Sequence, residues 1–272
     1  MKSVTPTASL GDFARKRELW WQFTVRAVET RHRGSYLGMV WAVLNPLLML
    51  CLYGVVFGIF FKNRFQVLPN ETGVDFALAM FLGLILFQIV AETMAIAPTL
   101  IVSQPNLVKK VVFPLEVLPL AQLGASWFHF LISLSLLLLG SLALGRGLTL
   151  SGLAWLPLIV MPLMLLTVGL AWLLAALGVF FRDIGQIAPF VSQIMLYTSA
   201  VVYSIKLIDP TVWTVLRWNP LLHTVQLARE AVLWQVPVNP LHLAYTWACG
   251  LAMFVVGGWF FRKMKPAFAD VI

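Results

Sequence analysis

Long apolar runs separated by short polar segments extend over most of the chain. Six of these runs reach about 20 residues and carry almost no charge, which is enough for a helix to cross the hydrocarbon core of a bilayer. The runs are residues 39–61, 76–98, 117–144, 155–181, 184–205 and 241–261. The pattern predicts an all-α integral membrane protein with six transmembrane helices, in one transmembrane domain that covers residues 1–272.

Composition points to the same class of protein. Hydrophobic residues make up 60% of the 272 residues and charged residues 11%, whereas a soluble domain has about a quarter of its residues charged. Cys51 and Cys249 both fall within predicted spans, so the sequence indicates neither a disulfide framework nor a metal site. The charged N-terminal segment before residue 39 lacks an apolar signal core, so we expect a retained first span rather than a cleaved leader.

The net charge of +8 is distributed unevenly along the chain. Of the 19 lysines and arginines, seven precede residue 39 and six more lie in other segments of the same predicted side, which leaves six for the opposite side. Lysine and arginine accumulate on the cytoplasmic side of membrane proteins. We therefore expect both termini in the cytoplasm, a multi-pass protein of the cytoplasmic (inner) membrane, and no nucleic-acid partner.

Residues 8–30 are too polar to span a membrane, but they are amphipathic. One broad face of the predicted helix is apolar, with most charges opposite: Leu10, Phe13, Ala14, Trp20, Trp21, Thr24, Val25 and Val28. We predict a cytoplasmic interface helix within residues 1–38, a membrane region over 39–261 and a cytoplasmic tail over 262–272. The interface helix either lies among lipid headgroups or docks on a protein, and the sequence leaves both open.

A charged segment at residues 106–119 separates two of the apolar runs. Lys109 and Lys110 indicate the cytoplasmic side. Pro114 and Pro119 remove backbone donors, so they bracket a short, kinked element. We predict a small helix at the cytoplasmic face, and an ordinary positively charged loop is an equal alternative on these residues alone.

Two polar features fall inside predicted spans. Pro46 follows Asn45 and removes a helical hydrogen bond, and the freed carbonyl must be satisfied by protein or water rather than by lipid. We therefore expect protein or a cavity beside these residues. Glu92 is an acid deep within a span, which makes it a functional candidate, with a role in helix packing as an equal alternative.

Aromatic residues make up 13% of the chain. Aromatic rings present large, rigid faces on which sugar rings can stack. Five aromatic residues within the predicted spans are candidates to line a path for a glycan, with packing in the membrane interior as the alternative: Trp41, Tyr53, Trp127, Trp172 and Tyr197.

The segment 206–240 lies on the outer side by parity but is rich in apolar residues. Asn219-Pro220 divides it into two pieces that are too short to span and that fit re-entrant or interfacial helices. We expect a gate here, near the outer exit, with an ordinary interfacial loop as the alternative. The gate residues would be Trp218, Asn219, Pro220, Arg229 and Glu230. We also expect Asn219, Arg229 and Glu230 to hydrogen-bond across the break and to fix the angle between the two helices.

Several kinds of chemistry have no signature in the sequence. There is no Gly-x-x-x-x-Gly-Lys-Ser/Thr motif, so we expect this chain to bind no ATP. The four histidines are scattered, and no carboxylate pair or Ser/His/Asp arrangement is evident, which argues against an enzyme and against a cofactor in this chain. A secondary carrier or channel, or a membrane enzyme of glycolipid synthesis, are the rival hypotheses.

Three motifs carry a resemblance to a known family. They are Arg-x-Arg-Gly-Ser-Tyr-Leu-Gly-x-x-Trp-x-x-Leu-Asn-Pro at 31–46, Asn-Leu-Val-Lys-Lys-x-x-Phe-Pro at 106–114, and Phe-Phe-Arg-Asp-Ile-Gly-Gln at 180–186. In this order they resemble the permease subunit of ABC exporters for polysaccharides, and the likeness covers essentially the whole chain. That family exports lipid-linked O-antigens, capsular polysaccharides and teichoic acids.

The resemblance implies partners and site residues. It implies a homodimer with two copies of a separate ATPase, which binds ATP and magnesium, and a lipid-linked polysaccharide as substrate, with O-antigen preferred. Because the two halves of the chain show no internal repeat, two copies would have to enclose the path. The resemblance also implies outer gate helices within 206–240, and a cytoplasmic coupling helix and turn that contact the ATPase: Asn106, Leu107, Lys109, Lys110, Phe113, Pro114, Glu116, Arg182 and Asp183.

Overall fold

A computed structural model describes residues 10–60, 64–109, 113–144 and 149–272. Within these residues the chain is helical and contains no β-strand. Five of the described helical segments are long and apolar enough to cross a membrane: Gly38–Phe57, Gly73–Leu100, Val117–Ala143, Ser151–Phe180 and Pro240–Val271. The prediction of an all-α, multi-pass membrane protein is confirmed.

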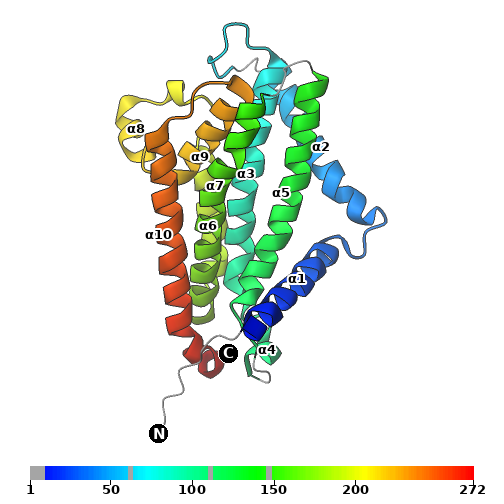
Figure 1. Cartoon of the computed structure of the whole chain (residues 1–272), viewed down its shortest axis with the longest axis vertical. Helices are drawn as coiled ribbons and strands as arrows, with labels where there is room; N and C mark the ends of the chain where they lie inside the picture. Colours follow the sequence, from blue (N-terminus) through cyan, green and yellow to red (C-terminus); the bar gives the residue numbers. More distant parts are fainter. Residues whose placement is uncertain (1–9, 61–63, 110–112, 145–148) are drawn as a thin grey trace.

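The long helices run side by side along the molecule (Figure 1). Helix α3 (Gly73–Leu100) packs against α5 (Val117–Ala143), α6 (Leu150–Phe180) and α7 (Ile184–Thr198). Helix α10 (Pro240–Met264) packs along α6. Most of α3 is buried, because its neighbours surround it. Apolar helices whose faces are covered in this way form the core of a bundle.

Glycines allow α6 and α10 to approach closely. A Cβ atom on Gly257 of α10 would lie 2.0 Å from the carbonyl oxygen of Gly169 on α6. A Cβ atom on Gly250 would lie 2.4 Å from the carbonyl oxygen of Pro162. Small residues at such contacts let the helix backbones meet inside a membrane.

The two ends of the molecule carry different short helices (Figure 1). At the lower end lie α4 (Pro105–Lys109) and α11 (Phe268–Val271). At the upper end lie α8 (Pro210–Leu216) and α9 (Pro220–Arg229). Helix α1 (Leu10–His32) leans against the lower part of α5, and α2 (Trp41–Tyr53) stands at the side of the bundle and continues into a π-helix, Gly54–Phe60.

The expected fifth span, 184–205, differs from the prediction. Its helix α7 has 15 residues and ends at Thr198, which gives about 22 Å at 1.5 Å per residue against a hydrocarbon core of about 30 Å. The chain then turns through Ala200, whose φ is +49°. Ser199, Ala200 and Val201 are buried in protein, which is where non-helical backbone is tolerated at membrane depth. The helix stops because side chains from other helices hold this turn, as described below.

Candidate functional site

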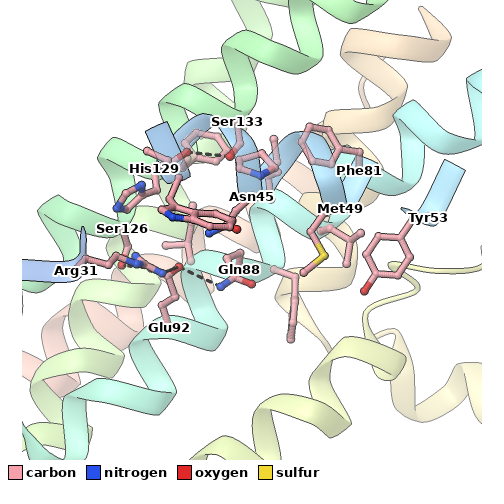
Figure 2. A pocket seen from close by; sticks show the side chains of 18 of the residues that line it. Arg31, Asn45, Met49, Tyr53, Phe81, Gln88, Glu92, Ser126, His129 and Ser133 are labelled. Atoms are coloured by element: carbon pink, nitrogen blue, oxygen red, sulfur yellow. Dashed lines mark hydrogen bonds and ion pairs between the residues drawn. The ribbon is translucent and has the colours of Figure 1, made fainter. Parts of the chain in front are cut away.

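A cavity of about 420 Å³ lies where α2 faces α3 and α5. Figure 2 shows aromatic and apolar side chains toward one end and polar side chains toward the other. Its polar lining consists of Arg31, Asn45, Gln88, Glu92, Ser126, His129 and Ser133. Its aromatic lining consists of Trp41, Tyr53, Phe81, Phe87 and Phe130. Asn45 and Pro46 also line the cavity. We expected either protein or a cavity beside them, and the structure has the cavity.

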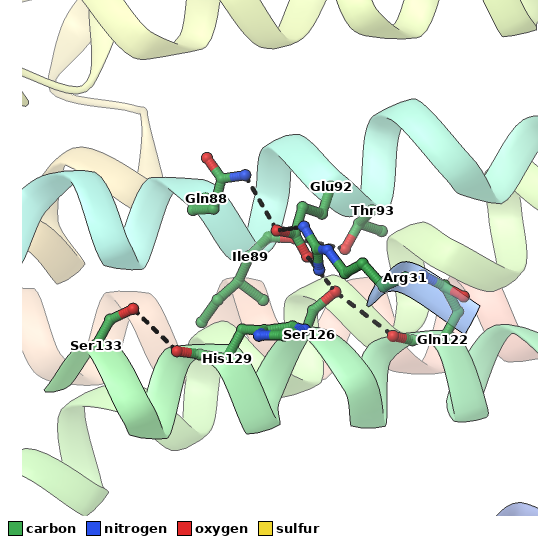
Figure 3. Close-up of polar contacts among 9 residues, drawn as sticks. All are labelled: Arg31, Gln88, Ile89, Glu92, Thr93, Gln122, Ser126, His129 and Ser133. Carbon is green, nitrogen blue, oxygen red and sulfur yellow. Dashed lines mark hydrogen bonds and ion pairs between the residues drawn. The ribbon is translucent and has the colours of Figure 1, made fainter. Parts of the chain in front are cut away.

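Glu92 anchors the polar end of this cavity (Figure 3). Arg31 donates from both terminal nitrogens, with Nη1 at 2.9 Å from Oε2 and Nη2 at 2.5 Å from Oε1. Ser126 Oγ donates to Oε2 at 2.7 Å, and Gln88 Nε2 donates to Oε1 at 3.0 Å. Glu92 is 8% exposed. Three side chains thus bind one buried carboxylate with four hydrogen bonds, and Arg31 neutralises its charge.

This arrangement follows from the cost of burying charge. A carboxylate without a partner is expensive to bury, and a two-point arginine contact is among the strongest ways to satisfy it. The hydrogen bond to Glu92 raises the pKa of the Arg31 guanidinium, a group that is charged at neutral pH in any case. Arg31 is on α1, Glu92 on α3 and Ser126 on α5, so one network joins three helices. Its partners are far apart in sequence, and tertiary packing brings them together.

Helix α1 is held in the position that this ion pair requires. Trp20 Nε1 donates to the carbonyl of Leu120 at 3.0 Å. Thr24 is buried against Gly124 of α5: a Cβ atom on Gly124 would lie 2.7 Å from the Thr24 side chain. The sequence leaves open whether α1 lies among lipid headgroups or docks on protein; the side with Trp20 and Thr24 packs on protein, against α5. Trp21 and Val25, expected on the same apolar face, are exposed, because the close contact at Gly124 selects a narrower face.

The five aromatic residues that we expected to line a glycan path do not all lie in the same cavity. Trp41 and Tyr53 line the cavity. Trp172 packs on Phe254 of α10, and its Nε1 donates to the carbonyl of Glu116 at 3.2 Å. Trp127 packs against the main apolar core, and its buried Nε1 has no hydrogen-bond partner among the described residues. Tyr197 is exposed on α7.

The predicted coupling residues gather at the lower end. Asn106 and Lys109 of α4 are exposed, whereas Leu107 packs against a buried apolar cluster that includes Ile101, Phe261 and Phe268. A short helix is therefore present here, but its bounds differ from the prediction: it ends at Lys109, and Pro119 does not bracket it because Pro119 lies in the first turn of α5. Lys110 lies outside the described residues.

The neighbours of α4 fix its place against the bundle. Phe113 packs against the same cluster and meets Phe23 of α1 at 5.2 Å between ring centroids, and Pro114 beside it is half-buried. Glu116 pairs with Lys265 at 3.0 Å. Arg182 and Asp183 form an exposed turn between α6 and α7, which lies at the same end because Gly185 is next to Thr99 of α3.

At the upper end, Asn219-Pro220 divides two short helices, as the sequence predicts. The Asn219 side chain accepts from Leu221 N at 3.0 Å, so it caps α9, and Pro220 occupies the first turn. Asn219 Nδ2 also donates to Ser199 Oγ at 2.9 Å, at the end of α7. Trp218 is exposed, and its carbonyl accepts from the Tyr245 hydroxyl at 2.7 Å.

The expected hydrogen bonds across the break between α8 and α9 are corrected. Asn219 binds the end of α7, and Arg229 binds α3 and the turn after α7. Glu230 accepts from Gln226 Nε2 at 2.9 Å, within its own segment. Asn219 and Arg229 therefore fix the junction and α9 to the bundle. The hydrogen bond that crosses the break is a different one, between His223 Nε2 of α9 and the carbonyl of Arg217 at the end of α8, 2.7 Å apart.

Sequence reasoning missed most of the polar cavity wall. It singled out Glu92 and Asn45, but it gave no site role to Arg31, Gln88, Ser126 or His129. A signal was present, because Gln88 and Glu92 are four residues apart, and Ser126, His129 and Ser133 recur at helical spacing. Two polar stripes on otherwise apolar spans indicate surfaces that face each other or a cavity.

The fold and the cavity together define a class of protein. A multi-pass helical bundle holds a cavity with an apolar part and a charged, hydrogen-bonding part between its spans. Among the described residues, no group of three or more His, Cys, Asp and Glu could hold a metal ion. Cavities between helices are typical binding sites of membrane transport proteins. The chain belongs to the ABC-2 type transporter family, whose family model matches residues 18–233.

Curated relatives are similar in sequence to most of this chain. The chain is 25% identical over 249 residues to the O-antigen export system permease protein RfbA of Klebsiella pneumoniae, which covers 92% of this chain and 93% of the relative. It is 30% identical over 184 residues to the O-antigen export system permease protein RfbA of Myxococcus xanthus, with 68% and 67% covered. It is also 25% identical over 210 residues to the polysialic acid transport protein KpsM of Escherichia coli, with 77% and 79% covered.

Proposed function

We propose that this chain is the permease subunit of an ATP-driven exporter that moves a lipid-linked polysaccharide across the cytoplasmic membrane. The observation that carries the proposal is the family match over residues 18–233, together with relatives named for O-antigen export at 25–30% identity. O-antigen is the preferred cargo, and the relative named for polysialic acid transport makes a capsular polysaccharide the second candidate.

The chemistry of the cavity suits a sugar chain. Trp41 and Tyr53 offer aromatic faces, and Asn45 and Gln88 offer amides that both donate and accept hydrogen bonds. A sugar ring has apolar C–H faces and a rim of hydroxyl groups, so it needs both kinds of contact. The cavity lies beside α2, whose outward face is exposed, so the cavity belongs to a path that a neighbouring element completes.

A second copy of the chain is the neighbour that fits best. Helix α7 presents an exposed apolar stripe at helical spacing: Ile187, Phe190, Val191, Ile194 and Tyr197. Helix α2 exposes Val43, Leu47, Leu48 and Leu52. One chain contains no internal repeat that could supply the other half of a path. We therefore place α2 and α7 at the interface of a homodimer that encloses the polysaccharide.

The energy source would be a separate ATPase, which binds ATP and magnesium, with two copies per assembly. This chain has no phosphate-binding loop motif. Exposed Asn106 and Lys109, with the turn at Arg182 and Asp183, form the surface proposed to contact it. This puts the lower end, with both termini, in the cytoplasm. It puts α8 and α9 at the outer face, as a gate that includes Trp218, Asn219 and Pro220.

Removal of the chain from its host tests the proposal. Cells without it should lose surface polysaccharide and should accumulate the lipid-linked polymer on the inner face, and a plasmid copy should restore export. Immunoblots of surface and total polysaccharide measure both quantities. Unchanged surface polysaccharide of every class in the deletion strain would contradict the proposal.

A further inference from the structure

Arg229 is buried although it belongs to a short helix at one end of the molecule. Its exposed fraction is 1%, and it is the largest of the fully buried side chains among the described residues. Buried arginines are normally paired with acids, yet the ion pairs of the described residues do not include Arg229. A charge buried in this way must be satisfied by other polar groups.

Backbone carbonyls from two distant segments take that role. Nε donates to the carbonyl of Ala79 on α3 at 2.8 Å. Nη1 donates to the carbonyl of Ala200 at 2.9 Å, and Nη2 to that of Val201 at 2.5 Å. The guanidinium also lies 4.4 Å from the ring centroid of Phe65. One side chain therefore joins α9, α3 and the turn that follows α7.

The turn after α7 depends on these donors. Beyond Thr198 the helix has ended, and Ala200 has a left-handed backbone conformation. The carbonyls of Ala200 and Val201 are buried with their residues, and a buried carbonyl without a donor is destabilising. Leu216 of α8 and Leu222 of α9 pack on Ala200 in one apolar cluster. Both short helices thus pack against this turn.

Helix α3 is shaped to admit the guanidinium. A Cβ atom on Gly83 would lie 2.6 Å from Arg229 Nη2 and 3.2 Å from Val225. The glycine leaves the room that the planar group needs to reach Ala79. A lysine could not replace this contact, because a single ammonium lacks the rigid fork that reaches three carbonyls in different directions.

We propose that Arg229 is a positioning residue that locks α8, α9 and the end of α7 to α3, so that the upper end of the transporter moves as one body. This proposal rests on the proposed function, because it describes how the outer gate of an exporter moves. Opening would then occur by movement of the whole unit with α3. It would not occur by bending at Asn219-Pro220.

Cysteine accessibility tests the lock without any transport assay. In a chain with Cys51 and Cys249 changed to Ala, a single Leu222→Cys probe, 1% exposed in the native protein, should resist a membrane-impermeant maleimide. Arg229→Lys should raise its labelling rate at least about tenfold, because charge-assisted hydrogen bonds are lost. Gly83→Ala keeps the arginine but displaces it, and should raise the labelling rate as well.

The matched control is Gly140→Ala, whose new Cβ atom would meet nothing closer than Leu78 at 3.8 Å. It should leave labelling unchanged. Co-purification of the ATPase verifies that each variant is assembled. If Arg229→Lys and Gly83→Ala both keep the probe protected, the lock is refuted. Because labelling is measured in resting membranes, this result is separate from a failure of polysaccharide export.

Discussion

Replacing Arg31 with Met is expected to reduce export by at least about tenfold and to lower the thermal stability of the protein. The change leaves the Glu92 carboxylate, 8% exposed, with Ser126 and Gln88 as its remaining donors. Breaking a buried ion pair from one side costs about 3–5 kcal/mol. Because the Arg31 side chain is 35% exposed, we expect roughly 1–3 kcal/mol here.

The reciprocal change should be milder, and this asymmetry is the decisive result. Glu92→Gln removes the buried charge, and the amide can still accept from Ser126. The double variant Arg31→Met/Glu92→Gln should therefore recover part of the stability lost in Arg31→Met alone. Thermal unfolding in detergent and surface polysaccharide measure the two effects. Arg26→Met, an exposed arginine on the same helix, is the control. Equal losses in Arg31→Met and in the double variant would show that an unpaired Glu92 charge is not the cause of the loss.

The second large effect is expected at the lower end, where α4 exposes Lys109. Reversing the charge of Lys109 and Lys110 together with Glu should abolish association with the ATPase, because two attractive contacts become repulsive. Membrane insertion should be unchanged, since Leu107 of α4 and the nearby Phe113 pack against the apolar cluster, whereas Lys109 is exposed. Co-purification of the ATPase with the tagged permease measures the loss.

A matched charge reversal separates this surface from general electrostatics. Lys263→Glu changes an exposed lysine near the same end, at the end of α10, and should leave the amount of co-purified ATPase unchanged. Export and co-purification that remain at native levels in the Lys109→Glu/Lys110→Glu variant would refute the coupling surface.

Local sequence signals predicted the features that depend on local chemistry. Five of the six apolar runs predicted helices that are long and apolar enough to cross a bilayer, because length and apolarity decide this. Asn219-Pro220 predicted the division between α8 and α9, because asparagine caps a helix and proline suits its first turn. Asn45-Pro46 predicted protein or a cavity rather than lipid beside α2, because a proline-freed carbonyl cannot face lipid, and the two residues line the cavity.

The features that sequence reasoning missed depend on contacts between distant residues. The end of α7 at Thr198 has no local breaker in Ser199-Ala200-Val201, and follows from donors on Asn219 and Arg229. The partner of Glu92 is 61 residues away. The buried face of α1 is chosen by the gap at Gly124, which hydrophobic periodicity does not reveal.

Purified permease and ATPase, reconstituted together in liposomes with a fluorescent lipid-linked O-antigen, give the most direct test of the central claim. ATP and magnesium are trapped inside the vesicles, so only complexes whose ATPases face the lumen are active. A lectin or antibody added outside the vesicles then reports how much polymer has crossed from the lumenal to the outer leaflet. Our account predicts translocation that requires ATP, both subunits and the native Arg31–Glu92 pair. Translocation by the permease alone without ATP would contradict this prediction. So would an assembled complex that hydrolyses ATP but translocates neither lipid-linked O-antigen nor lipid-linked capsular polysaccharide.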